Sequence, residues 1–351
     1  MAASEMLVAR LHGRQDLRLV TEPVPDPAPG ECLVQVTAVG ICGSDLHWYA
    51  DGGIGDARLA RPLVIGHEAA GVIVSGPRAG QRVAIDPAVP CERCTPCLAG
   101  HRNLCPTVGF LGHGATDGAL RQYLTWPEHL LHPMGDSLSD ADIAMLEPLG
   151  VAIHAHDLGH PRIGASVVIV GCGPIGLCLL QVARAAGASR IYAVDPLAHR
   201  AGAALALGAD VTLPVEPADF AAAIGELTGG EGVDVVYEAS GSDAAIALAL
   251  EAAAPGARAV LAGIPDDDRT TFSASVARRK GLSLLLVRRM KEAYPRAAAL
   301  VERGAVDVRS LVTHQFGLPE VKTALTTAHT RSGLKVIVTP TAPATPNSAT
   351  S

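Results

Sequence analysis

The chain has 351 residues, of which 48% are hydrophobic and 18% are charged, and its formal net charge is -7 at pH 7. This length is sufficient for two hydrophobic cores, so it favours two domains. The acidic balance and the absence of a long Lys/Arg cluster argue against nucleic acid or an anionic membrane as a partner, and chemistry on a small molecule fits better.

The N-terminus lacks the basic region followed by an apolar region that marks a signal peptide. Most of the eight cysteines can be assigned as metal thiolates, which indicates a reducing compartment, so we expect a cytoplasmic protein. One segment, 163–180, has the hydropathy of a membrane span. Because three of its glycines and a proline cluster at 171–176, it predicts a buried strand, a turn and a helix instead.

Up to about Ala144 the chain carries short alternating apolar runs, such as 32–37 and 71–74, which Gly and Pro interrupt. This pattern predicts a β-rich domain of short strands. From Ala165 onward, apolar runs alternate with Ala-rich helical stretches. The runs are 167–170, 191–194, 211–213, 233–237, 259–262 and 282–287. Such alternation predicts an α/β fold with a doubly wound parallel sheet.

A cluster of four cysteines lies within the β-rich part of the chain, at Cys91, Cys94, Cys97 and Cys105. Three of them are spaced by two residues, so they can fold onto one ion, and the fourth closes the loop from the far side. The spacing predicts a structural Zn²⁺ site. Two disulfides are the alternative, which the tight clustering and the expected reducing compartment disfavour.

A glycine-rich loop follows the first apolar run of the α/β part, with the sequence Gly171-Cys172-Gly173-Pro174-Ile175-Gly176. The first glycine permits a tight turn, the second lets the backbone approach a pyrophosphate, and the third allows close packing of helix and strand. The helix N-terminus then faces the anion. Between a strand and a helix, this motif predicts a dinucleotide site.

Asp195 ends the next apolar run, where it can accept hydrogen bonds from the hydroxyls of an adenosine ribose. Its negative charge would repel a 2′-phosphate, so NAD is predicted as the cofactor in preference to NADP. Arg200 is a competing signal, because it could pair with such a phosphate or lie against the adenine.

Two further features concern the end of the chain and its assembly. Segment 339–351 is rich in Pro, Ser and Thr and poor in apolar residues, so we expect it to be disordered. The apolar run 282–287 is predicted at the edge of the sheet, where an uncovered strand invites pairing with another chain. A homo-oligomer, either a dimer or a tetramer, is therefore expected.

Taken together, the motifs resemble one known family. GICGSDLHWY, GHEAAGVI, the four-cysteine segment, EPLGVAIHA and VGCGPIG occur in an order and spacing similar to those of the zinc-containing medium-chain dehydrogenases. The chain most resembles the polyol branch of that family, whose members act on sorbitol, xylitol or iditol. The similarity extends from about Leu7 to Val338.

The resemblance implies a domain organisation and an active-site cleft. A GroES-like catalytic domain spans 1–150 and carries the zinc lobe 91–105, a Rossmann NAD-binding domain spans 151–290, and 291–338 returns to the catalytic domain. The residues that resemble the nicotinamide side of the cleft are Ala262, Gly263, Ile264, Val287 and Arg288. Those that resemble the substrate side are Trp48, Glu147, Arg289 and Met290.

The resemblance also implies a catalytic zinc ion in addition to the structural one, which gives two zinc ions per subunit. Cys42, His67 and Glu68 supply a thiolate, an imidazole and a carboxylate, and such three-ligand sites leave a position for substrate. Because adjacent residues of a regular strand face opposite sides, His67 and Glu68 reach one ion only if the chain turns, which Gly66 permits.

Several polar residues are expected around that ion. Glu147 is the competing carboxylate, and we rank Glu68 as the direct ligand and Glu147 as a group near the metal. Asp45 is expected to accept the other ring N–H of His67 and so fix its tautomer. Ser44 and His47 occupy the positions of the family's proton relay, so a proton could leave through them or through Glu147.

The chain departs from the polyol branch in its substrate pocket, where Trp48 and Met290 stand at positions that resemble those of tyrosines in that branch. The loss of two hydroxyl donors leaves related substrates open, namely L-idonate, L-threonine and 2,3-butanediol. For a polyol, the resemblance implies hydride transfer from a secondary alcohol group to NAD⁺, which gives the ketose. For the related substrates it implies the same chemistry.

Three other classes of protein fit the sequence less well. A nucleic-acid-binding zinc protein would explain the cysteines but not the dinucleotide loop, and the acidic charge opposes it. A zinc hydrolase has no need of a nucleotide-binding sheet. A non-catalytic or zinc-free relative shares the fold but lacks Cys42, His67 and the cysteine lobe, so their presence here favours an enzyme.

Overall fold

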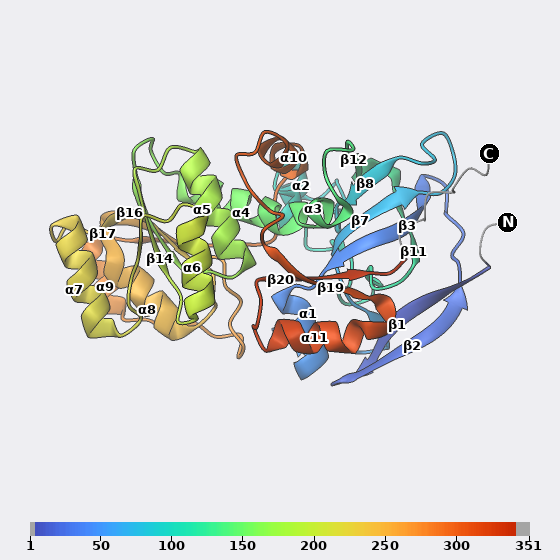
Figure 1. Ribbon diagram of the computed structural model, residues 1–351, viewed down its shortest axis with the longest axis horizontal. Coiled ribbons are helices and arrows are strands. Elements are labelled where there is room, and N and C mark those ends of the chain that lie inside the picture. The colour runs from blue at the N-terminus through green and yellow to red at the C-terminus, as the bar shows by residue number, and fades with distance from the viewer. Residues whose placement is uncertain (1–3, 342–351) are drawn as a thin grey trace, which may run out of the picture.

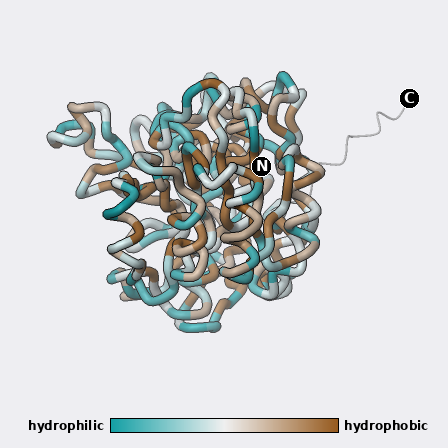
Figure 2. Tube along the Cα trace, turned by 90° about the vertical axis from the view of Figure 1, so that its left-hand side faces the viewer, coloured by the Kyte–Doolittle hydropathy of each residue, from teal (hydrophilic) through white to brown (hydrophobic). Residues whose placement is uncertain are grey.

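The computed structural model describes residues 4–341 of the chain. In Figure 1 a parallel sheet with its helices occupies one half of the molecule, mainly antiparallel sheets occupy the other half, and α4 (Leu146–Gly159) lies between them. The hydrophobic stretches lie mainly inside this arrangement, and many outer turns are hydrophilic (Figure 2). The α/β class predicted from the sequence is confirmed.

The β-rich half is built on one large sheet, in the order β12 (Leu131–Pro133), β8 (Arg82–Ile85), β7 (Glu68–Ile73), β3 (Glu31–Gly40), β20 (Lys335–Thr339) and β19 (Val312–Gly317), with β11 (Tyr123–Pro127) also paired to β3. A second sheet has the order β2 (Asp16–Pro23), β1 (Glu5–Gly13) and β6 (Leu63–Val64). Two separate strand pairs complete the β-rich half: β10 (Gly109–Phe110) with β9 (Ala88–Val89), and β4 (Gly53–Ile54) with β5 (Ala57–Arg58).

Short helices surround these sheets. They are α1 (Gly43–Asp51), α2 (Thr95–Leu98), α3 (Asp140–Ala144) and α11 (Val321–His329), with the 3₁₀ turns η1 (Arg102–Leu104), η2 (Glu128–Leu130) and η3 (Leu318–Glu320). Because β20 pairs with β3, the last described strands join a sheet whose other strands come from the N-terminal part of the chain.

The other half is a parallel sheet of six strands in the order β15 (Val211–Thr212), β14 (Arg190–Val194), β13 (Ser166–Val170), β16 (Val233–Glu238), β17 (Ala253–Leu261) and β18 (Ser283–Leu286). The strand order reverses beside β13, so the carboxyl ends of β13 and β16 open the crevice in which such sheets bind ligands. The helices are α5 (Pro174–Ala185), α6 (Ala198–Ala206), α7 (Pro217–Thr228), α8 (Asp243–Ala252), α9 (Ala274–Lys280) and α10 (Tyr294–Glu302).

Alternation along the parallel strands explains why helices cover both faces. Val167 and Ile169 of β13 pack into a core with α4, α5 and α10, whereas Val168 and Val170 face a second core with α7, α8 and α9. Successive side chains of a strand point to opposite faces, so a continuous apolar run is buried on both. The first core also includes Ala70 of β7, so apolar packing continues between the halves through α4.

The structure differs from the sequence prediction at the end of the chain. Disorder was predicted from residue 339 onward, but Thr339 ends β20 and the Thr341 hydroxyl donates to the Val36 carbonyl at 2.7 Å. Pairing with the central sheet therefore extends order past the polar composition change. The remainder of that segment, 342–351, lies outside the described residues.

Candidate active site

Cys42, His67 and Glu68 come together where α1 and β7 begin. One ligand atom from each lies within 4.8 Å of the others, which fits the thiolate, imidazole and carboxylate donors of a three-ligand zinc site. Gly66 has φ +95°, a left-handed conformation that glycine adopts without strain, and it turns the chain just before His67. The turn lets two consecutive side chains face one point.

Asp45 fixes the backbone around this cluster. Its carboxylate accepts the amide N–H of Cys42 and that of Gly66, each at 2.9 Å. Burial alone would raise the pKa of Asp45, yet the His67 ring and the two amide donors hold it below its usual value. The Oδ1 atom of Asp45 lies 3.6 Å from Nδ1 of His67, which is longer than a hydrogen bond. The expected hydrogen bond between the carboxylate and the imidazole is therefore a longer, electrostatic contact in this structure.

Glu68 has a second partner that the sequence did not reveal. Its Oε2 forms an ion pair with the ammonium group of Lys335, and both side chains are buried. The carboxylate passes directly over Gly40, where an added Cβ would lie 2.0 Å from Oε2. Glycine at this position of β3 is therefore required by the path of the Glu68 side chain.

Glu147 lies on the first turn of α4 and is 5% exposed. Burial and the nearby Glu68 carboxylate raise the pKa of Glu147 to about 7. Glu147 is not one of the three clustered residues. Because the charges of His67 and Glu68 act on its pKa, its carboxyl group lies near that cluster. Such a group can hold or release a proton near neutral pH.

The expected relay pair is not joined in the structure. Both ring nitrogens of His47 face carboxylates: Nδ1 lies 3.3 Å from Asp51 and Nε2 lies 3.7 Å from Asp266. Within residues 4–341 no hydrogen bond links Ser44 to His47. Instead, His47 lines a pocket with Arg58 and the aspartates of the loop after β17.

Arg289 is linked to the cluster of Cys42, His67 and Glu68 through aromatic contacts. Its guanidinium carbon lies 3.9 Å from the ring centroid of Phe110, and the Phe110 ring lies 5.2 Å from that of His67. The Nη1 atom of Arg289 is buried and has no hydrogen-bond partner among residues 4–341, and burial lowers the pKa of this group to about 10. An unsatisfied buried donor beside the cluster can bind an oxygen of a ligand.

The other two residues expected on the substrate side pack against neighbouring parts of the protein. Trp48 is 1% exposed and packs edge-on against His113 with centroids 5.2 Å apart. Trp48 is thus enclosed in the core of the β-rich half, and its contact with substrate stays a prediction. The Met290 sulfur packs on α4 at Gly150, where an added Cβ would lie 2.4 Å from it.

The glycine loop forms the tight turn between β13 and α5. Gly171 has φ +94°, and a Cβ on Gly176 would lie 1.8 Å from the Gly171 carbonyl oxygen. Asp195 follows β14 and accepts the N–H groups of Cys172 at 2.8 Å and Leu197 at 2.9 Å. The loop and Asp195 are therefore held together at the carboxyl ends of adjacent strands.

Arg200 lies against the same loop. Its Nη1 would be 3.6 Å from a Cβ on Gly173, and its buried Nε has no partner. Burial lowers the pKa of Arg200, whereas Asp195 opposes that shift. Ile175, on the first turn of α5, is half-buried.

The expected nicotinamide side is built on β16 and β17. The Glu238 carbonyl accepts the N–H groups of Ala262 at 2.7 Å and Gly263 at 3.2 Å. A Cβ on Gly263 would lie 2.0 Å from the Gly241 nitrogen, so two backbones touch there. Ile264 is 48% exposed, and the Val287 N–H donates to Leu261 at 2.9 Å. Arg288 follows Val287 with an exposed side chain.

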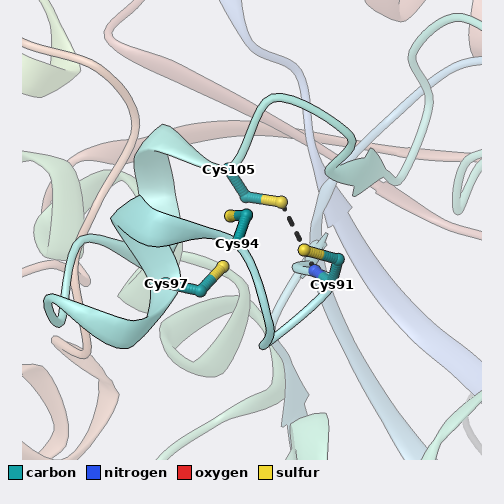
Figure 3. Close-up of side chains that lie close together, drawn as sticks. All are labelled: Cys91, Cys94, Cys97 and Cys105. Carbon is teal, nitrogen blue, oxygen red and sulfur yellow. Dashed lines mark hydrogen bonds between the residues drawn. The ribbon is translucent and has the colours of Figure 1, made fainter.

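The four cysteines of the lobe point their sulfur atoms toward one another (Figure 3). Their ligand atoms lie within 4.8 Å of one another, and no disulfide joins them. The Cys91 N–H donates to Cys105 Sγ at 3.3 Å, and backbone N–H groups of Arg93 and Cys94 lower the pKa of Cys91 to about 6. Burial raises the pKa of Cys97 to about 12, so the four thiols do not ionise alike, but the convergence of their sulfur atoms fits a closed zinc site.

Sequence reasoning missed Lys335, Phe110, Asn103 and Glu238. For Lys335, Phe110 and Asn103 a single sequence gives no sign that the chain will bring them to the site. Only Glu238 offered a signal, because an acidic residue at the end of an apolar strand is unusual.

Comparisons with known proteins identify the family. Residues 28–136 match the alcohol dehydrogenase GroES-like domain, and residues 174–303 match the zinc-binding dehydrogenase family. The chain is 35% identical over 343 residues to sorbitol dehydrogenase of Bacillus subtilis (strain 168), covering 95% of this chain and 97% of that protein. The chain belongs to the zinc-dependent alcohol dehydrogenases of the medium-chain family.

Solved structures agree with this assignment. L-idonate 5-dehydrogenase of Escherichia coli has a TM-score of 0.88 at 26% identity, with 95% of this chain and 98% of that chain covered. An alcohol dehydrogenase of E. coli CFT073, solved with NADH, has a TM-score of 0.88 at 28% identity, with 96% and 100% covered. The chain is thus an oxidoreductase with zinc and a nicotinamide cofactor. Among the helices of residues 4–341, none is long and apolar enough to cross a membrane.

Proposed function

We propose that the protein oxidises a secondary alcohol group of a polyol such as sorbitol, xylitol or iditol to the ketose, with NAD⁺ as the hydride acceptor. The observation that carries this proposal is the convergence of Cys42, His67 and Glu68 beside the buried guanidinium of Arg289. The similarity to sorbitol dehydrogenase over 95% of the chain supports the substrate class.

The chemistry divides between bound groups and side chains. Zinc held by Cys42, His67 and Glu68 would supply the Lewis acidity that lowers the pKa of an alcohol, and nicotinamide would accept the hydride. Arg289 binds a substrate hydroxyl through its unsatisfied Nη1. Glu147 holds the released proton, because burial raises its pKa to about 7. Glu147→Gln should then lower kcat more than His47→Asn does. The reverse order would favour proton transfer through Ser44 and His47.

NAD is proposed over NADP because Asp195 lies beside the glycine loop, where a ribose would bind. The carboxylate accepts hydrogen bonds from ribose hydroxyls and repels a 2′-phosphate. Arg200 lies beside Gly173 of the same loop, where its guanidinium can attract that phosphate, so the balance between these two charges sets the preference.

A polyhydroxy acid such as L-idonate is the second candidate substrate. The buried, unpaired Nη1 of Arg289 favours it, because a carboxylate is the strongest partner for a guanidinium. Neither Trp48 nor Met290 carries a hydroxyl group, so neither side chain offers an O–H donor to a polyol.

A panel of alcohols tests both candidates. We expect NAD⁺ reduction with sorbitol, xylitol, iditol or arabinitol, and weaker turnover of L-idonate, L-threonine and 2,3-butanediol. Arg289→Met should raise KM for the best substrate about tenfold or more, because it removes a charged hydrogen-bond donor. Arg303→Met is the control, since Arg303 is an exposed arginine that follows α10 and has no assigned role in the site. Turnover of none of the polyols would contradict the proposal.

We also propose a homo-oligomer in the cytoplasm. Strand β18 lies at the edge of the parallel sheet, and Leu286 on it is 77% exposed, so the edge offers both backbone groups and apolar surface to a second copy. The thiols of the cysteine cluster suit a reducing compartment. Sedimentation of a monomer at micromolar concentration, or recovery of the protein outside the cytoplasmic fraction, would contradict these points.

A further inference from the structure

The cysteine lobe contacts the segment that carries Arg289. This segment, 288–292, joins β18 to α10, and the turn η1 of the lobe lies against it. Asn103 of η1 is 5% exposed, and its side-chain Nδ2 donates to the Arg288 carbonyl at 2.9 Å. The same Nδ2 lies 3.4 Å from Nε2 of His154 on α4, the helix that carries Glu147.

Simple hydrogen-bond accounting fixes the orientation of the Asn103 amide. A carbonyl oxygen can only accept, so the NH₂ group must face Arg288. Burial lowers the pKa of His154, which favours the neutral imidazole, and in the tautomer with the proton on Nδ1 its Nε2 accepts the second N–H. The Oδ1 atom of Asn103 is left buried without a partner. Both N–H donors of the Asn103 side chain therefore have an acceptor, whereas its oxygen has none among the described residues.

The segment that Asn103 holds has an unfavourable backbone. Arg289 has φ +55° and Glu292 has φ +44°, in the left-handed region that L-residues avoid. Such conformations persist only where the surroundings impose them. On one side Met290 packs on Gly150 of α4, and on the other Arg102 of η1 lies 3.9 Å from Glu292.

We propose that Asn103 is a positioning residue for substrate recognition. Its amide holds the Arg288 carbonyl, so that the left-handed Arg289 keeps its guanidinium over Phe110 beside the metal cluster. The cysteine lobe then orders the substrate side of the active site in addition to stabilising its own fold. The role in recognition rests on the proposed function, in which Arg289 contacts the alcohol.

Two substitutions of nearly equal volume test this role. Asn103→Asp replaces the NH₂ donor by a carboxylate oxygen that repels the Arg288 carbonyl, and Asn103→Leu removes both polar atoms. Each should raise KM for the alcohol about tenfold, the factor that corresponds to the loss of about one buried hydrogen bond. The kcat, the KM for NAD⁺ and the zinc content should change less than about twofold. Leu104→Ala is the control, because Leu104 lies on the same turn and is 50% exposed.

Hydrogen exchange of the amides in 288–292 provides a readout that needs no turnover. Exchange there should be faster in both Asn103 variants and unchanged in Leu104→Ala. An unchanged KM and unchanged exchange would overturn the proposal. A parallel loss of zinc, kcat and NAD⁺ affinity would also overturn it, because it would indicate a purely structural role. If the wild type oxidises no alcohol of the panel, the proposed function fails, while the exchange measurement still decides whether Asn103 holds the segment.

Discussion

Replacing Cys42 by serine is expected to lower kcat for polyol oxidation by more than about 1000-fold and to reduce the zinc content from about two ions to one per subunit. The residue caps α1 and supplies the only thiolate of the three-residue cluster in the described chain. A hydroxyl is a far weaker zinc ligand than a thiolate at neutral pH. Metal analysis and steady-state kinetics on the same preparation check both parts.

Cys32 provides the matched control. It is a half-buried free cysteine on β3, outside both clusters, so Cys32→Ser should keep two zinc ions and normal turnover. Cys97→Ser should instead lose the other zinc and destabilise the fold, because Cys97 is buried in the lobe. If Cys42→Ser retains two zinc ions and full activity, the catalytic metal site has been placed on the wrong residues.

Changing Asp195 should alter cofactor selection by about 100-fold. The wild type is expected to favour NAD over NADP in kcat/KM, and Asp195→Ala should reduce that ratio about 100-fold, which corresponds to about 2.8 kcal/mol. Two effects combine: the ribose hydroxyls lose an acceptor, and Arg200 beside Gly173 becomes free to approach a 2′-phosphate. Kinetics with both cofactors at saturating alcohol give the ratio.

A second variant separates charge from structure. Asp195 also accepts the N–H of Cys172, so its removal loosens the glycine loop and weakens binding of both cofactors. Asp195→Asn retains an acceptor for one amide while removing the charge, so it should shift the ratio with a smaller loss of overall affinity. Asp210→Asn, on the same sheet, should leave the ratio unchanged. A wild type that already prefers NADP would contradict the assigned role of Asp195.

The parts of the fold that could be predicted from the sequence are those that local patterns determine. The apolar runs of the parallel sheet and the glycine turn at Gly171 depend on neighbours along the chain. The four cysteines were equally clear, since their spacing alone brings them to one ion. The cluster of Cys42, His67 and Glu68 required the family resemblance, because no short spacing links the first ligand to the other two.

What could not be predicted depends on contacts between distant segments. Lys335 meets Glu68 only because β20 returns beside β3, and Asn103 meets Arg288 across 185 residues of chain. Trp48 was expected at the substrate, yet its position on α1 turns it into the core toward His113. The order of residues 339–341 likewise arises from pairing with β3 and its neighbours, which the Pro/Thr composition does not indicate.

Deuterium transfer from a labelled polyol tests the proposed reaction most directly. The wild-type enzyme is incubated with NAD⁺ and a polyol of the panel that carries deuterium on its secondary carbinol carbons, and the reduced cofactor is analysed by mass spectrometry. Direct hydride transfer predicts that the nicotinamide gains one deuterium per turnover and that the labelled substrate reacts more slowly. Reduced cofactor without deuterium, or no reduction with any polyol, would contradict the assignment of this chain as a polyol dehydrogenase.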